Sequence, residues 1–399
     1  MNAPIRLTPA ELTLIEQLTA HGATAEAERL SGAGLPTRKV ESYHYTDLKS
    51  LLRTVPAVAD VGAGSAAPLL DVPGAARLVI ANGVPLPADE QPAGVSVGVV
   101  DGSGLTTRDD AIVRLNKGLV AQSLDLNIEG EAGTIQIDRR VDGPAAHVAS
   151  SATIYVADGA SVTIVEVYGG SDAAHVANHA TYIAVGKGAQ VTHISVELSG
   201  KAATHFATNE YHLAEDAQLR TLAIHRGAAL ARTQLFPRFE GPRAHADITA
   251  LNLVGEGQHT DVTMDASHAV AHTTSKPLFK SIARGNGIAV VQGRLVVERD
   301  AQKTDAKLMA QGLMLSDQAM ILAKPELEIY ADDVVCGHGA TCGRLDDDSL
   351  FYLMSRGVPK AEAETMLTRA FLAEMLDPIE DEGLNDTLTG VIEDWLLES

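Results

Sequence analysis

The sequence has very few cysteines and aromatic residues. Cys336 and Cys342 are the only two cysteines among 399 residues, so a disulfide framework cannot organise the fold. Aromatic residues make up 4% of the chain, whereas glycine, alanine and the β-branched residues are abundant. Small and β-branched side chains are typical of closely stacked strands. The composition therefore favours a mainly β protein.

Positive charge and long apolar runs are also scarce. Lys and Arg number 31 against 52 Asp and Glu, which gives a net charge of −21. This balance opposes non-specific binding to nucleic acids and to anionic membranes, and we expect neither as a partner. No run of about 18 apolar residues occurs, and the first residues lack the apolar core of a signal peptide. We therefore expect a cytoplasmic location.

The first part of the chain predicts helices followed by short extended pieces. Thr8 fits a helix N-cap, with Pro9 at the first helical position and Glu11 closing a capping box. The chain is long enough for two or three modules. We assign residues 1–110 to an N-terminal helical region and linker.

Segments in the middle of the chain repeat at a nearly fixed period. Four copies align on an alanine, with spacings of 28, 29 and 28 residues, and a weaker fifth copy follows: Ala132, Ala160, Ala189, Ala217 and Ala246. Each copy places a polar turn between two strands, which is typical of a solenoid coil. A β-sandwich or jelly roll is the alternative, but only stacked coils require equal path lengths. We therefore predict a parallel β-helix over residues 111–343.

Residues 344–399 predict a compact acidic helical module with 14 acidic and 4 basic side chains. Its last segment carries an apolar stripe at helical spacing, formed by Leu388, Val391, Ile392, Trp395 and Leu396. We expect this module to cap the open end of the solenoid, and it could also dock a partner.

Cys336 and His338 are the best candidates for contact with a metal. On a strand, residues two apart project from the same face, and Gly337 and Gly339 leave the backbone open to a ligand or another chain. Thiolate and imidazole suit iron–sulphur species. Two ligands do not complete a tetrahedral site, so the others must come from elsewhere, most simply from a second protein. The alternative is a structural turn with a buried cysteine and an incidental histidine.

The other histidines are weaker candidates, although eleven of the fourteen lie between His147 and His272. The close pairs, such as His175 with His179, are four residues apart, or about 13 Å on a strand at about 3.3 Å per residue. Such pairs cannot chelate one ion, and we expect these histidines to decorate the faces of the solenoid.

A carbohydrate-active β-helix enzyme, a lyase or hydrolase, is the alternative function. It would need carboxylates that converge in a substrate groove. The candidates are scattered along the sequence: Asp261, Asp265, Asp300 and Asp305.

Four motifs resemble the SufD family of iron–sulphur cluster assembly proteins. They are GLPTRKVESYHYTDL near the N-terminus, and KTDAKLMAQGLMLS, AKPELEIYADDVVCGHGATCGRLDDDSLFYLMSRGVP and AFLAEML toward the C-terminus. The related SufB proteins are usually longer and lack the CxHGAT motif, so SufD is the better match. Cys342 departs from the family pattern, in which an aliphatic residue is expected.

The resemblance implies a right-handed parallel β-helix between helical N- and C-terminal regions. It also implies a non-enzymatic scaffold subunit of the SUF complex, which pairs with SufB through the β-helix and binds the ATPase SufC through the C-terminal module. His338 and Cys336 match the family residues that would contact a transient iron–sulphur cluster or iron, held only at the interface with SufB. A homodimer through the free β-helix edge is conceivable for the isolated chain.

Overall fold

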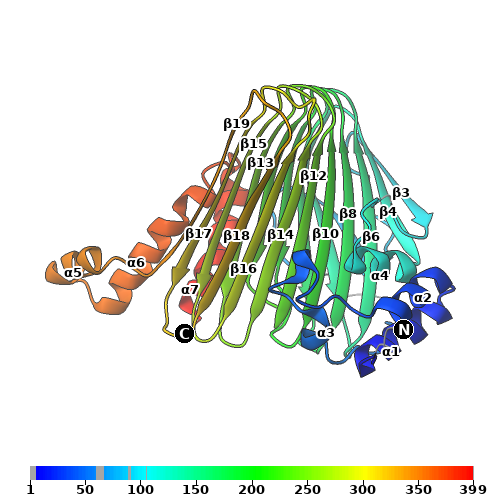
Figure 1. Cartoon of the computed structure of the whole chain (residues 1–399), viewed down its shortest axis with the longest axis horizontal. Helices are drawn as coiled ribbons and strands as arrows, with labels where there is room; N and C mark the ends of the chain where they lie inside the picture. Colours follow the sequence, from blue (N-terminus) through cyan, green and yellow to red (C-terminus); the bar gives the residue numbers. More distant parts are fainter. Residues whose placement is uncertain (1–5, 60–66, 89–90, 105, 399) are drawn as a thin grey trace.

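Two facing sheets form a parallel β-solenoid (Figure 1), in a computed structural model that describes residues 6–59, 67–88, 91–104 and 106–398. In the described residues, sheet A has nine strands, in the spatial order β18 (Met320–Ile329), β16 (Ile288–Val297), β14 (His259–His268), β12 (Leu230–Phe239), β10 (Thr204–Leu213), β8 (Val176–Val185), β6 (His147–Val156), β4 (Gln122–Ile128) and β3 (Val95–Asp101). Sheet B has ten, in the order β19 (Val335–Gly343), β17 (Asp305–Met314), β15 (Thr274–Ala283), β13 (His245–Val254), β11 (Gln218–His225), β9 (Gln190–Glu197), β7 (Ser161–Gly170), β5 (Glu131–Val141), β1 (Ala76–Ala81) and β2 (Val84–Pro85).

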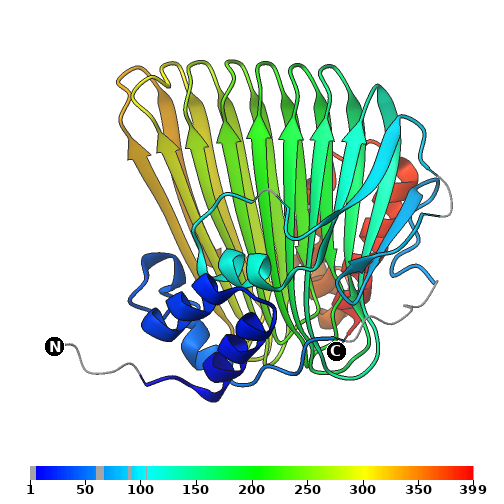
Figure 2. The same cartoon turned by 90° about the vertical axis from the view of Figure 1, so that its right-hand side faces the viewer.

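From β4 onward, successive strands alternate between the sheets, so two strands and two turns make one coil (Figure 2). Neighbouring coils pair in parallel, as between β8 and β10 or β9 and β11. The predicted mainly β solenoid is confirmed. Its right-handedness, which would follow the general rule for parallel crossovers, stays a prediction.

The repeat alanines stack where each coil turns into sheet B. Ser161 pairs with Gln190, and Gln190 with Gln218, so the preceding Ala160, Ala189 and Ala217 align as expected. The predicted fifth copy is misplaced, because Gln218 pairs with His245 and the aligned residue is therefore Ala244 rather than Ala246. The first copy is irregular as well, since the pairing of β5 with β7 shifts around Ala132.

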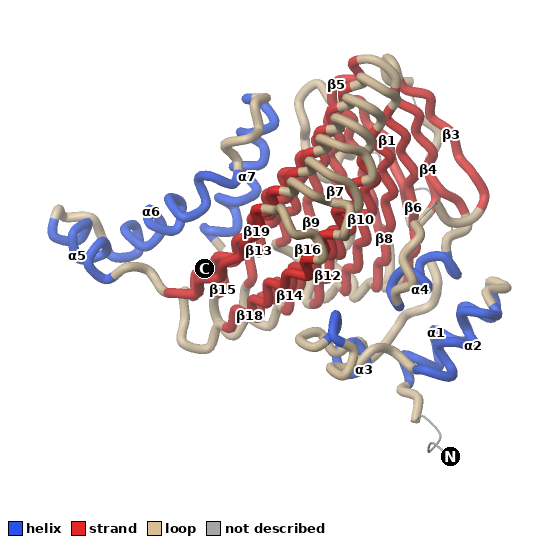
Figure 3. The backbone as a smooth tube through the Cα atoms, turned by 45° about the horizontal axis from the view of Figure 1, so that its top comes forward, coloured by secondary structure: helices blue, strands red, loops and turns tan. Residues whose placement is uncertain are grey.

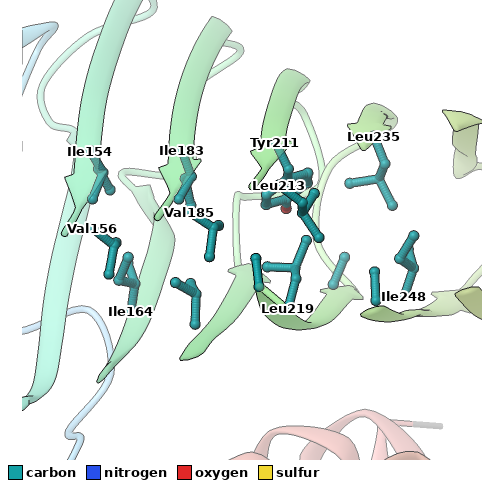
Figure 4. Packing of buried hydrophobic residues seen from close by; sticks show 14 of the residues in the cluster. Ile154, Val156, Ile164, Ile183, Val185, Tyr211, Leu213, Leu219, Leu235 and Ile248 are labelled. Carbon is teal, nitrogen blue, oxygen red and sulfur yellow. The ribbon is translucent and has the colours of Figure 1, made fainter. Parts of the chain in front are cut away.

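The main core lies between the two sheets. Figure 4 shows apolar side chains from sheet A, such as Ile154 and Ile183, meeting Ile164 and Leu219 of sheet B. Fully burying a side chain of this size contributes about 1.5–3 kcal/mol. Because each coil adds a similar layer, the core extends along the whole solenoid.

Part of the interior is polar. Arg139 and Glu166 form a fully buried ion pair at 2.8 Å, and Glu166 also accepts from the hydroxyl of Tyr168 at 2.6 Å. The expectation that the histidines decorate the faces is wrong for the seven that are buried: His147, His175, His179, His193, His205, His225 and His268. Most of them bond inside the protein, as His225 does to Asn252 at 3.1 Å.

Helices near the N-terminus cover part of the outer face of sheet A. They are α1 (Pro9–Ala20), α2 (Thr24–Ala33), the 3₁₀ turn η1 (Glu41–Tyr43), α3 (Leu48–Leu51) and α4 (Ala111–Leu119). The predicted capping box of Thr8 and Glu11 is present in α1. Leu14 and Leu18 of α1 join a cluster with Ile112 of α4 and Phe206 of β10.

The C-terminal helices are α5 (Asp347–Ser355), α6 (Lys360–Leu372), the 3₁₀ turn η2 (Ala373–Met375) and α7 (Glu382–Leu397). The predicted stripe on α7 is buried, but against the outer face of sheet B, where Leu388 and Trp395 cluster with Val196 and Ile224. The module therefore does not cap the end of the solenoid, and that expectation is wrong. Figure 3 shows α5 and α6 extending away from the sheets.

The sheets begin earlier than residue 111, because β1 already pairs with β5 and β3 with β4. The three-part division of the chain, at residues 110 and 343, stays a prediction. None of the helices in the described residues is long and apolar enough to cross a membrane.

Candidate functional site at the open end of the solenoid

The two ends of the solenoid differ. At the N-terminal end, β3 pairs antiparallel with β4, and the short β2 pairs antiparallel with β1. At the other end, β18 and β19 are the last strands, and within the described residues each has a neighbour on one side only. We call this pair of edge strands the open end. Unpaired edge strands present free N–H and C=O groups to another chain.

The open end also exposes large apolar side chains. Met320 and Ile329 on β18 are 48% and 41% exposed, and Tyr330 and Val335 nearby are 59% and 60% exposed. The inner positions of β18 are only half-buried, because no further coil covers them. Ile329, Tyr330 and Val335 lie around the turn between β18 and β19, whereas Met320 lies at the other end of β18. An exposed apolar patch such as the one at this turn marks an interaction site.

Strand β19 carries both predicted site residues on its inward face. Cys336 pairs with Ala306 of β17, and His338 pairs with Leu308. Ala306 and Leu308 belong to the main core, so Cys336 and His338 continue that inward row into the last layer. Cys336 is half-buried against the core, and His338 is exposed.

Cys336 and His338 do not make a metal site by themselves. In the part of the chain that the structure describes, no group of three or more His, Cys, Asp and Glu side chains is placed to hold a metal ion. β19 has a neighbouring strand on one side only, so its free edge is open to an approaching chain. A second chain on this edge could therefore supply further ligands.

Residues 139–371 match the family model described as SUF system FeS cluster assembly, SufBD core domain. The chain belongs to this SufBD family. It is 30% identical to the iron–sulfur cluster assembly protein SufD of Escherichia coli over 373 residues, which cover 90% of this chain and 88% of that protein. The resemblance predicted from the motifs is thereby confirmed.

Other relatives match shorter parts of this SufBD family chain. A SufBD family protein of Synechocystis is 32% identical over 235 residues, 57% of this chain and 52% of that protein. The SufD protein of Bacillus subtilis is 36% identical over 142 residues, 35% of this chain and 32% of that protein.

Cys342, where the sequence departs from the SufD pattern, is separate from the Cys336–His338 pair. Strand β19 pairs with β17 without a register shift, so no bend brings Cys342 back toward Cys336. Six strand residues separate the two thiols by about 20 Å. Sγ of Cys342 packs over Gly312, 3.2 Å from where a Cβ would stand, and lies 4.0 Å from the carbonyl oxygen of Ile321.

Burial raises the pKa of Cys336, and the carboxylate of Asp305 raises it further, although a backbone hydrogen bond with Ala306 lowers it. The thiol is therefore protonated at neutral pH and has to lose its proton before it binds a metal. This suits a ligand that acts in an assembled complex better than a reactive nucleophile.

The carboxylates weighed for an enzyme do not converge in this SufBD family member. Asp261 forms a buried ion pair with Arg232, and Asp265 lies between Arg108 and Arg294. Both carboxylates are thus held by arginines within the protein.

Reasoning from the sequence alone missed the exposed apolar residues at the open end. Met320, Ile329 and Val335 look like ordinary strand residues, and only their place in the last coil exposes them. A signal was present in the repeat itself, since the coils stop before residues 344–399.

Proposed function

We propose that this SufBD family chain is a non-enzymatic scaffold subunit of the SUF iron–sulphur cluster assembly complex. It pairs with SufB through the open end and binds the ATPase SufC through its C-terminal helical module. Cys336 and His338 contribute ligands to a nascent cluster, or to iron, that is held only between the two β-solenoids.

One observation carries this proposal: a thiol and an imidazole lie on the same face of an edge strand whose other edge has no partner among the described residues. An edge strand gains backbone hydrogen bonds when another strand pairs with it. When a partner's strand pairs with this edge, the ligands on the edge strand come into contact with the partner. Pairing with a second chain would thus complete both the sheet and the ligand set.

The apolar side chains of the open end support an interface with SufB. Tyr330 and Val335 flank the approach to β19 and are both more than half exposed. Large aromatic and aliphatic side chains of this kind are typical anchors of protein interfaces. In the absence of SufB, the same edges offer a second copy of the chain a place to pair, which gives a homodimer.

The arm formed by α5 and α6 supports the docking of SufC. Helix α5 has no buried residue, and Phe351, Tyr352 and Met354 on it are 74%, 56% and 44% exposed. Helix α7, in contrast, is fixed to sheet B by its buried stripe. A fixed base and an exposed apolar tip are suited to binding another protein.

The relatives support a role in cluster assembly, and no comparison supports the carbohydrate-active alternative. The net charge is the reason why neither nucleic acids nor membranes are expected as partners. The lack of a long apolar run is the reason for the expected cytoplasmic location.

Substitutions at the open end test the pairing with SufB. We expect Tyr330→Asp with Val335→Asp to weaken SufB binding by at least about tenfold, because charges would replace apolar anchors. The matched control is Val99→Asp with Val100→Asp, which changes two exposed valines on β3 at the opposite end. Binding is measured by calorimetry or surface plasmon resonance. Equal binding by the two double variants would contradict pairing through the open end.

A further inference from the structure

One N-terminal segment, residues 38–47, crosses the outer face of sheet A toward the open end; we call it the crossing segment. Thr46 bonds to His259 of β14 at 3.0 Å. The carbonyl oxygen of Ser42 accepts a hydrogen bond from Gln292 of β16 at 3.2 Å. Glu41 forms an ion pair with Lys324 of β18, so the segment reaches an edge strand of the open end.

The crossing segment is anchored firmly. The ring of Tyr43 is buried under the guanidinium of Arg232, 4.1 Å from its centre, and its hydroxyl donates to Asp110 at 2.8 Å. Arg232 also donates to the carbonyl oxygen of Ser42 at 2.7 Å. A segment held in this way binds a partner without a large loss of conformational entropy.

Two exposed cations, Arg38 and Lys39, lie at the start of the crossing segment, whereas the exposed Glu41 is paired with Lys324. The side chain of Arg38 is 76% exposed, and its one ion pair, with Asp47, spans 4.0 Å. Lys39 is exposed and has no ion pair among the described residues, and Val40 beside it is 45% exposed.

We propose that Arg38, Lys39 and Val40 form a second contact patch that receives an acidic segment of the subunit seated on the open end. The patch adjoins β18 through the Glu41–Lys324 pair, so a partner that pairs with the edge strands passes beside it. Opposite charges steer association and fix its orientation. This inference rests on the proposed pairing with SufB.

Charge reversal tests the patch against SufB from the same genome. The variant Arg38→Glu with Lys39→Glu is compared with Arg6→Glu with Arg53→Glu, which reverses two exposed cations outside the crossing segment. We expect the patch variant to associate with SufB about tenfold more slowly at low salt, with the difference shrinking at high salt, and the control to change much less.

Two other results overturn the inference in different ways. If the patch variant associates with SufB no more slowly than the control does, the proposed contact patch is wrong, whereas pairing through the open end is not affected. If the unaltered chain does not bind SufB at all, the proposed function fails and the patch fails with it.

Discussion

Single residues explain how the turns of the solenoid are built. At one turn position of successive coils the backbone is left-handed, and glycine gives way to other residues along the chain: Gly159, Gly188, Asp216, Arg243, His272 and Lys303. At most of these positions the residue's N–H bonds to the next coil, as from His272 to Gln302 at 2.9 Å. The need for this hydrogen bond fixes the conformation even where the side chain disfavours it.

The substitution His272→Gly should raise the free energy of unfolding by about 0.5–1 kcal/mol, because relief of the left-handed strain, about 1–2 kcal/mol, outweighs the entropy that glycine costs. His272 is exposed, so little packing is lost. Urea unfolding measures the change.

The control for this substitution is Asp300→Gly, at an exposed turn position without a positive φ. It should lower stability by about 0.5–1 kcal/mol, since glycine loses more entropy on folding. A loss of stability in both variants would contradict the account of the turn.

The placement of the histidines could not be predicted from the sequence. Both faces of these strands carry polar residues, so alternation alone does not separate inside from outside. His179 and His193 are buried because Ser150 and Tyr211 bond to them across the interior. The same-face placement of Cys336 and His338 was easier to predict, because it depends only on strand geometry.

At the scale of the elements, the alanine repeat predicted the early coils of the solenoid but not the later ones. The alanine signature fades after Ala244, although the coils continue to β19. Thr273 and Thr304 take the equivalent positions, where their hydroxyls lie 3.2 Å apart and Thr304 also bonds to the carbonyl oxygen of Ala301. A threonine whose hydroxyl is hydrogen-bonded takes the place of alanine there. The period of the coils therefore continues, but the alanine that makes it visible in the sequence is missing.

The arm of α5 and α6 gives a prediction at the same scale. Phe351→Ala with Tyr352→Ala should weaken SufC binding by about 2 kcal/mol, or roughly 30-fold, as expected for exposed aromatic anchors. Thermal stability should not change, because α5 buries no residue. Pull-down and titration with purified SufC measure the effect.

Leu397→Ala is the control for the arm, because Leu397 is 72% exposed but lies on α7. Point substitutions are preferable to deleting residues 344–399, which would uncover the outer face of sheet B. Undiminished SufC binding by the aromatic double variant would contradict docking on the arm.

In the whole molecule, buried histidines make stability depend on pH. Burial lowers the pKa of His205 and His268 to about 3 and that of His147 and His225 to about 4. The unfolded chain takes up protons below about pH 6.5, whereas these folded sites do not. Stability is therefore lost as the pH falls below about 6.5. His212 acts in the opposite direction, because its flanking carboxylates raise its pKa.

Unfolding by urea should show this loss between pH 6.5 and 5.5. Each of the four histidines lowers the free energy of unfolding by about 1 kcal/mol across this range, and carboxylates titrate mainly below it. A free energy of unfolding that stays constant across the range would contradict the burial of neutral imidazoles.

The arrangement of the whole molecule was only partly predictable. The apolar stripe of α7 was evident from the sequence. Two apolar surfaces could have covered it, however: the end of the core and the outer face of sheet B. Packing on sheet B leaves β18 and β19 uncovered. The scaffold function depends on that outcome, because a capped end could not present Cys336 and His338 to a partner.

The most direct test of the scaffold account is cluster formation by the His338→Ala variant in a complex reconstituted with SufB and SufC. Thr341→Ala is the control, since Thr341 is exposed on the same strand but lies an odd number of residues from His338 and so faces the other way. Loss of a metal ligand should reduce the cluster yield about tenfold or more, with complex formation and thermal stability unchanged. The yield is measured by the visible absorbance and circular dichroism of the cluster. A yield equal to that of the Thr341→Ala complex would contradict the role of His338 at the interface.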